Sequence, residues 1–108
     1  MPETMKTIPA IFDTLPRYES NPFLAHLKAD HADIVLATYP SGKTVEPHFH
    51  ETANCGVITQ GEMILTIEGA EQRYGPGQWY FIPAGATHWS RFEQETRSVE
   101  FYFTAAAL

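Results

Sequence analysis

The chain of 108 residues has little cysteine, little positive charge and no long hydrophobic run. A single cysteine, Cys55, excludes an internal disulfide and is typical of a reducing compartment, so a cytoplasmic location is expected. No apolar run approaches the roughly 20 residues that a membrane-spanning helix needs, so we expect no membrane partner. Residues 1–10 lack the apolar segment of a signal peptide, and none is expected.

Positive charge is scarce and scattered. Lys and Arg number 7 against 13 Asp and Glu, which gives a formal net charge of -6. Nucleic-acid binding depends on basic residues that neutralise phosphates, so we expect no nucleic-acid partner. The sequence also lacks a Ser-His-Asp set, a glycine-rich phosphate loop and a CxxC pair, so nucleophilic and nucleotide chemistry have no support.

Helical periodicity is also missing, and short runs of β-branched and aromatic residues take its place. Glycine and proline clusters separate these runs every 8–12 residues or so, a spacing typical of β-sandwiches and small barrels. The pattern predicts strands at residues 23–29, 33–39, 44–50, 55–59, 63–68, 72–74, 78–82, 87–92 and 97–104. The residues alone therefore predict an all-β sandwich or barrel.

The first residues differ in composition from the rest. Residues 1–21 contain Pro2, Pro9 and Pro16, which discourage a helix, together with scattered apolar side chains. We expect an extended arm that packs across the domain or onto a partner subunit, or alternatively a frayed terminus. Residues 22–108 are then a single barrel domain.

Three histidines have the spacing of a metal site. His48 and His50 are two residues apart, so on a strand both side chains point to the same face. His88 opens a predicted strand just after a tight turn and could supply a third nitrogen. The alternative is that His48 and His50 are surface residues of a half-exposed strand.

Around these histidines lie two spaced motifs. The first contains Gly42, His48, His50 and Gly61, and the second contains Gly77, Pro83, Gly85 and His88. Together they resemble the two motifs of the cupin family over the central half of the chain. Asn54 stands where the family has an acidic ligand, and Phe92 stands where it has an asparagine.

The resemblance implies a fold, a cofactor and two kinds of function. The fold would be a double-stranded β-helix, or jelly-roll barrel. Small members of the family often form homodimers, so a homodimer is expected here too. One divalent metal ion, which could be Fe, Mn, Zn, Ni or Cu, would be held by His48, His50 and His88. The protein would be a small-molecule enzyme of the dioxygenase, isomerase or lyase type. The alternative is a non-catalytic module that binds or senses a small ligand.

A fourth metal ligand is open to several readings. Asn54 could bind directly or through water, whereas Cys55 would favour soft metals and Glu46 shares the strand parity of His48. Three neutral imidazoles without a carboxylate leave the metal its full charge, which favours an anionic or enolate-forming substrate.

Aromatic residues could form the wall of a small-molecule pocket. Candidates are Trp79 and Phe81, or Tyr80 if the other parity faces inward, and Trp89. Met63 could lie near the mouth, and Tyr102 and Glu100 are candidates on the last strand. Ordinary core packing is the alternative for the aromatic residues of the wall.

Overall fold

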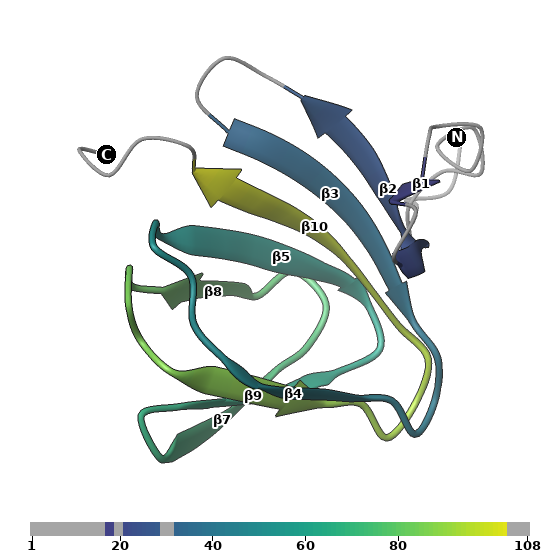
Figure 1. Ribbon diagram of the computed structural model, residues 1–108. Coiled ribbons are helices and arrows are strands. Elements are labelled where there is room, and N and C mark those ends of the chain that lie inside the picture. Colours follow the sequence, from purple (N-terminus) through teal and green to yellow (C-terminus); the bar gives the residue numbers. More distant parts are fainter. Residues whose placement is uncertain (1–16, 19–20, 29–31, 104–108) are drawn as a thin grey trace.

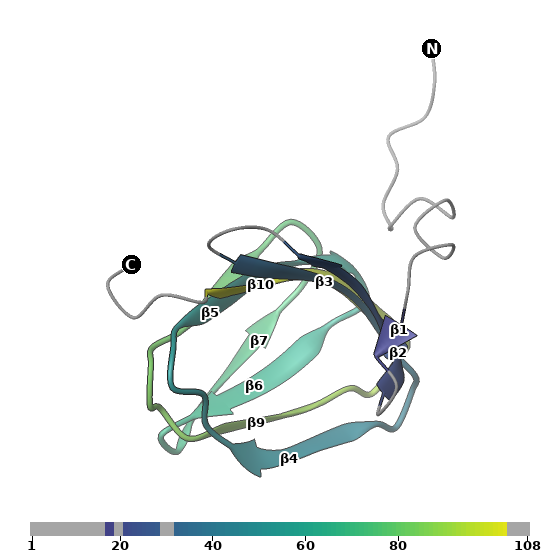
Figure 2. The ribbon, with the colours of Figure 1, turned by 45° about the horizontal axis from the view of Figure 1, so that its top comes forward.

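The computed structural model describes residues 17–18, 21–28 and 32–103, which form two facing antiparallel β-sheets (Figure 1). Figure 2 shows the sheets as two layers, with β3, β5 and β10 in one and β4, β6 and β9 in the other. Within the described residues no helix is long and apolar enough to span a membrane. This architecture is a jelly roll, and the predicted fold class is confirmed.

The first sheet has six strands in the order β1-β2-β3-β10-β5-β8. These strands are β1 (Arg17–Tyr18), β2 (Asn21–Lys28), β3 (Ala32–Tyr39), β10 (Thr96–Phe103), β5 (Asn54–Gln60) and β8 (Trp79–Ile82). Strand β10 lies between β3 and β5, and its pairing with β5 sets Glu100 opposite Gly56 and Tyr102 opposite Asn54. Because paired residues point to the same face, these four positions share one side of the sheet.

The second sheet has four strands in the order β4-β9-β6-β7. They are β4 (Thr44–His48), β9 (His88–Arg91), β6 (Met63–Ile67) and β7 (Ala70–Tyr74). Between β4 and β9 the register shifts, since Val45 pairs with Ser90 and His48 pairs with His88. Two residues of β4 therefore oppose one residue of β9, which is the arrangement of a β-bulge.

The hydrophobic core fills the space between the sheets. Its buried members come from β5, β6 and β8 and from the connections around β9, and they are Ile58, Met63, Leu65, Tyr80, Ile82, Ala86 and Phe92. Strand β8 shows the alternation clearly, because Tyr80 and Ile82 are buried whereas Trp79 and Phe81 are exposed. The core-facing residues of β8 are thus the even-numbered ones.

All nine predicted strands are present, with boundaries within two residues of those predicted. The short strand β1, which pairs with β2, was not predicted. Most of the predicted arm, residues 1–16 and 19–20, lies outside the described residues. The extended arm therefore stays a prediction.

Two glycines with similar backbone angles offer a test of close packing. Gly61 and Gly69 both have positive φ, 81° and 83°, but only Gly61 lies against other residues. A Cβ at Gly61 would collide with the Glu95 carbonyl oxygen and with Thr96, whereas a Cβ at Gly69 would meet nothing within 4 Å.

We expect Gly69→Ala to lower the free energy of unfolding by about 1–2 kcal/mol, the cost of a left-handed alanine. Gly61→Ala should cost about 1–3 kcal/mol more, because the turn must also move away from Glu95 and Thr96. Urea denaturation of both variants measures the difference. Equal losses would show that the turn at Gly61 yields without strain.

Candidate metal centre

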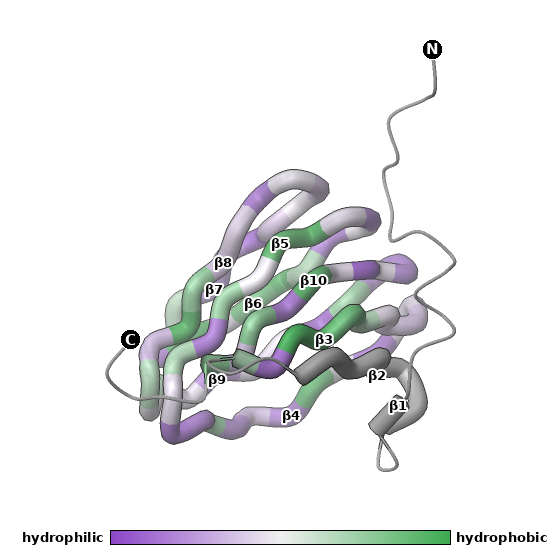
Figure 3. Tube along the Cα trace, turned by 90° about the horizontal axis from the view of Figure 1, so that it is seen from above, coloured by the Kyte–Doolittle hydropathy of each residue, from purple (hydrophilic) through white to green (hydrophobic). Residues whose placement is uncertain are grey.

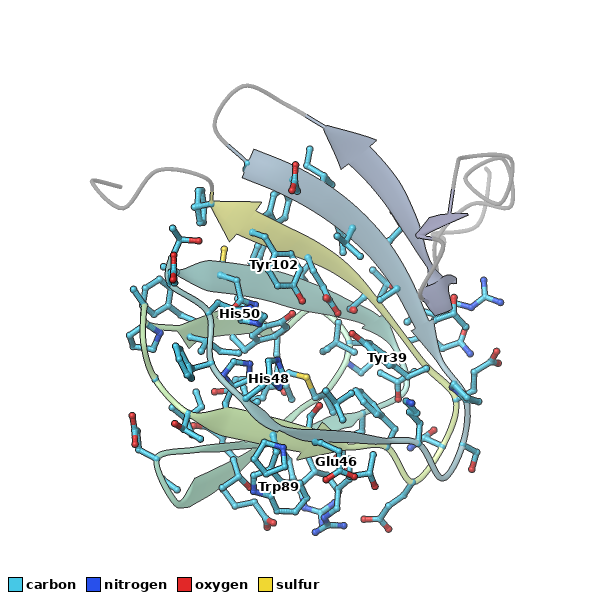
Figure 4. All side chains as sticks on the ribbon, in the orientation of Figure 1. Tyr39, Glu46, His48, His50, Trp89 and Tyr102 are labelled. Carbon is cyan, nitrogen blue, oxygen red and sulfur yellow. The ribbon has the colours of Figure 1, made fainter. Side chains whose placement is uncertain are left out.

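Three histidines from two strands and a loop lie together between the sheets (Figure 4). His48 is the last residue of β4, and His88, its cross-strand partner, is the first residue of β9. His50 lies in the loop after β4, where its carbonyl accepts a hydrogen bond of 2.8 Å from the Gly85 N–H. A nitrogen from each of the three histidines lies within 4.8 Å of the others.

Backbone carbonyls orient two of the three rings. Nδ1 of His48 lies 2.7 Å from the carbonyl oxygen of Glu46, and Nδ1 of His88 lies 2.9 Å from that of Ala86. Because a carbonyl oxygen only accepts, each Nδ1 donates its proton and leaves Nε2 with a free lone pair. Metal-binding histidines are held in this way, with the second ring nitrogen bonded to a carbonyl or carboxylate.

The spacing of the ring nitrogens suits a shared cation. Nε2 of His48 and Nε2 of His50 are 3.1 Å apart. With metal–nitrogen bonds of about 2.0–2.1 Å, two ligands lie about 2.9 Å apart at a right angle and about 3.3 Å apart at a tetrahedral angle. The observed separation falls between these values, so the two nitrogens can bind one ion.

The environment favours the neutral form of His50 and His88. Burial, followed by the proximity of His48 and His88, lowers the pKa of His50. Burial also lowers the pKa of His88, and His48 adds to this effect, although the hydrogen bond to Ala86 acts against it. A neutral imidazole is the form that binds a metal.

Next to the histidines lies a cavity of about 50 Å³. Its wall comes from both sheets and contains Tyr39, Val45, His48, Asn54, Met63, Leu65, Tyr80, Ile82, His88, Ser90, Glu100 and Tyr102. A water molecule occupies about 10–15 Å³ on this measure, so the cavity holds a few waters or the head of a small molecule.

Asn54, a predicted candidate ligand, lies in this wall with an unsatisfied oxygen. The side chain is 2% exposed, and its Oδ1 has no hydrogen-bond partner among the described residues. A buried carbonyl oxygen without a partner is costly, which points to a missing cation or hydrogen-bond donor. The three imidazoles fit a divalent metal ion, and this oxygen lies in the wall of the same cavity.

A buried carboxylate is a further feature of the cavity, and from the sequence it was only one of two candidates on the last strand. Glu100 is 2% exposed and accepts hydrogen bonds from the hydroxyls of Tyr39, Ser98 and Tyr102 at 2.7, 2.7 and 2.8 Å. The ring of Tyr102 also contacts the edge of the His50 ring, with centroids 5.3 Å apart. The carboxylate and the histidines are therefore linked through Tyr102.

The signal that could have shown that Glu100 faces inward is the parity of β10. Residues 96, 98 and 100 are buried and polar, whereas the apolar Val99 and Phe101 lie on the opposite face. A polar parity is ordinarily read as the solvent face of a strand. Here the polar side chains face the cavity. A rule based on hydrophobic alternation would therefore assign the inner face of β10 to solvent and the outer face to the core.

The same reversal corrects three of the predicted pocket residues. Trp79 and Phe81 are 59% and 58% exposed and lie outside the cavity, where Tyr80 takes the inward position. Trp89 lies on the outer side of its sheet, because its neighbours His88 and Ser90 face inward (Figure 4). Met63 and Tyr102, also predicted, do line the cavity.

Two alternative ligands point away from the histidines. In a regular strand Glu46 and His48 would point to the same face. The bulge separates them, so His48 faces inward with Val45 whereas Glu46 is exposed (Figure 4). Cys55 neighbours the inward-facing Asn54, so it has the opposite parity on β5. Burial raises the pKa of the Cys55 thiol, which disfavours the thiolate needed for metal binding.

Phe92, at the second departure from the family pattern, is a core residue. It is 2% exposed and stacks on Tyr39, with ring centroids 4.2 Å apart. Its backbone also closes the β4–β9 end through bonds with Gly42 and Lys43. Phe92 thus supports Tyr39, one of the hydroxyl donors to Glu100.

Comparison with known families gives a match over more than half of the chain. A model described as "Cupin domain" matches residues 35–104, which include all three histidines. No protein in the curated set matches the sequence significantly.

Solved structures share the fold at low sequence identity. An RmlC-like cupin from Shewanella frigidimarina NCIMB 400 aligns with a TM-score of 0.75 and 14% identity, covering 86% of each chain. KdgF from Halomonas sp. aligns with a TM-score of 0.69 and 19% identity, covering 82% of this chain and 84% of that chain. The DMSP lyase DddQ from Ruegeria pomeroyi DSS-3 has a TM-score of 0.66 and 23% identity, over 74% of this chain and 42% of that one. Identities this low show the fold alone.

The unpaired oxygen of Asn54 leads to a stability prediction. Asn54→Leu should raise the free energy of unfolding of the metal-free protein by about 1 kcal/mol, since it removes a buried acceptor without a donor. Ser98→Ala should lower the same quantity by about 1.5–3 kcal/mol, since it removes a donor to the buried carboxylate. Denaturation in the presence of a chelator compares them. A loss in both variants would mean that Asn54 Oδ1 is satisfied in solution.

Proposed function

The chain belongs to the cupin domain family, and on that basis we propose that it binds one divalent metal ion and acts as a small-molecule enzyme. The observation that supports metal binding most directly is the pair of Nε2 atoms of His48 and His50, 3.1 Å apart, with His88 beside them. His48, His50 and His88 would hold the ion, with Asn54 as a fourth contact or as a partner of a bound water. The metal could be Fe, Mn, Zn, Ni or Cu.

Such an ion would act as a Lewis acid on an oxygen of the substrate. The chain's own part is to present three neutral imidazoles, to limit water in a small cavity, and to place the carboxylate of Glu100 in the opposite wall. A dioxygenase-, isomerase- or lyase-type reaction is consistent with this arrangement. The similarity in fold to a protein described as a lyase supports the enzyme proposal only as an analogy.

The second candidate is a non-catalytic module that binds or senses a small ligand. The small volume of the cavity, about 50 Å³, favours it, since enzyme pockets for larger substrates have roughly 300–1,000 Å³. Oxygen uptake with small diketones and acids, measured on metal-loaded protein purified without an affinity tag, separates the two candidates. The single free cysteine supports a cytoplasmic location for either.

We also propose a homodimer, formed through the outer face of the six-stranded sheet. Six apolar residues on three neighbouring strands form what we call the outer patch, in two registered rows: Trp79, Val57 and Val99, and Phe81, Cys55 and Phe101. Figure 3 shows hydrophobic residues gathered along β5 and β10. A sheet face open to water is ordinarily polar, so an apolar outer face implies a covering layer.

A second copy of the chain is the occupant that the charges favour. The outer patch has no acidic or basic side chain, so it offers nothing for a charged partner to pair with. The chain as a whole has a net charge of -6, so two copies meet with less repulsion through an uncharged face than through an acidic one. Two such faces can pack as sheets do in a β-sandwich, about 10 Å apart and related by a twofold axis.

Replacing two histidines tests the metal site. Loss of a residue that only hydrogen-bonds to a metal ligand lowers metal affinity about 10- to 100-fold. His48→Ala and His88→Ala remove a ligand itself, so each should lower the affinity by more than that. Phe49→Ala, between two of the histidines but exposed, should keep its metal and serves as the control. Elemental analysis gives the metal content, and circular dichroism verifies the fold. Stoichiometric metal in both histidine variants would refute the assignment.

Charged substitutions test the dimer. Wild-type protein should run as a dimer in size-exclusion chromatography with light scattering, and Trp79→Glu with Phe81→Glu should give monomers. The control is Phe49→Glu, because Phe49 is equally exposed at 62% but lies off the outer patch. A monomeric wild type, or a dimer that survives the double substitution, would refute the proposal. If deletion of residues 1–16 alone gives monomers while the double variant stays dimeric, the arm rather than the patch forms the interface.

A further inference from the structure

Glu100 has room for one more hydrogen bond. Its Oε2 accepts from the hydroxyls of Tyr39 and Ser98, both at 2.7 Å, and its Oε1 accepts from Tyr102 at 2.8 Å. A carboxylate has about four acceptor sites, two on each oxygen. Three are filled, so one site on Oε1 is open, and Glu100 lines the cavity.

Asn54 supplies an unsatisfied acceptor in the same wall. It lies opposite Tyr102 in the β5–β10 pairing, two residues from Gly56, which lies opposite Glu100. Its Oδ1 is buried without a partner. One acceptor without a donor, beside a carboxylate with one open site, means that whatever fills the cavity should bring hydrogen-bond donors.

The charge of Glu100 limits the kind of donor further. Among the described residues, no Lys or Arg forms an ion pair with it. An anionic group against this uncompensated carboxylate would be repelled, whereas a neutral hydroxyl would be attracted. A hydroxyl also accepts hydrogen bonds, which suits the hydroxyls of Tyr80 and Ser90 that line the cavity too.

The carboxylate is held rigidly enough to select a ligand. Tyr39 stacks on the buried Phe92, and Gly56 leaves space for Tyr80, whose hydroxyl would collide with a Cβ at that position. Burial, and then the charge of Glu100, raises the pKa of both Tyr39 and Tyr80 well above the usual value, so both phenols stay protonated.

We propose that the cavity recognises a small α-hydroxy acid or α-hydroxy ketone whose hydroxyl donates a hydrogen bond to Oε1 of Glu100. The carboxylate or carbonyl oxygen of this molecule faces the three histidines, so the inference rests on the metal-binding function proposed above. Glu100 is then the residue that determines specificity for the hydroxyl. Five non-hydrogen atoms, as in glycolate, match a cavity that holds a few waters.

Glycolate and its methyl ether, methoxyacetate, test this directly. They carry the same carboxylate, but only glycolate has a hydroxyl donor. Metal-loaded wild-type protein should bind glycolate about 10- to 100-fold more tightly in isothermal titration calorimetry, the usual effect of one hydrogen bond to a charged group. Glu100→Gln should reduce this preference to less than about threefold, whereas Glu62→Gln, a change at a carboxylate outside the cavity, should keep it.

Each outcome bears on the proposal. Equal binding of the two compounds by wild-type protein, binding of neither, or an unchanged preference in Glu100→Gln would overturn it. The wild-type comparison needs no variant, so misfolding of Glu100→Gln cannot obscure the answer. Metal content is measured on the same samples. Loss of metal from the wild type would refute the proposed function, whereas bound metal without hydroxyl selectivity would refute only the role of Glu100.

Discussion

The site depends on one cross-strand pair, His48 opposite His88, and on the bulge that makes this pair face inward. Val45 and His48 have opposite parity, so a regular strand could turn only one of them into the interior. The extra residue in β4 lets Val45 pack on the core while His48 meets His88. Pro47 lies within this bulge on an edge strand, where the absence of an N–H costs little. The bulge therefore allows one five-residue strand both to pack on the core and to place His48 beside His88.

Around this pair the cavity separates its polar groups by charge. On one side lie His50 and His88, whose pKa is lowered by burial, and on the other lies a carboxylate surrounded by phenols whose pKa is raised by burial. Burial keeps both kinds of ring neutral, although it moves their pKa values in opposite directions. Glu100 is thus the cavity's charged side chain, and it faces whatever the histidines hold. This polarity gives a bound molecule a preferred orientation.

The strands and the histidine cluster could be read from the sequence because their signals are local. Glycine and proline turns set the strand limits, and the spacing of His48, His50 and His88 marks the site. The inward face of β8 and β10 could not be read, because the outer faces of these strands carry large apolar residues. Trp79 and Phe101 are as hydrophobic as core residues and stack on each other outside the core, with ring centroids 6.1 Å apart. Hydrophobic alternation cannot distinguish a face that packs on the core from a face that packs on a partner.

The departure at Asn54 takes on a meaning once β5 and β10 are aligned. An acidic residue there would place a carboxylate next to the histidines and cancel part of a metal's charge at the ion itself. With asparagine at that position, the negative charge stands on the next strand, where Glu100 lies opposite Gly56. Glu100 does not belong to the cluster of ligand atoms formed by the histidines, so it would act across the cavity rather than directly on a metal ion held there. With the negative charge in the far wall, a metal ion held by the histidines would keep its full positive charge, and the two charges would polarise a bound molecule from opposite ends. This is the arrangement expected for a site that distinguishes the two ends of a small, oxygen-rich ligand.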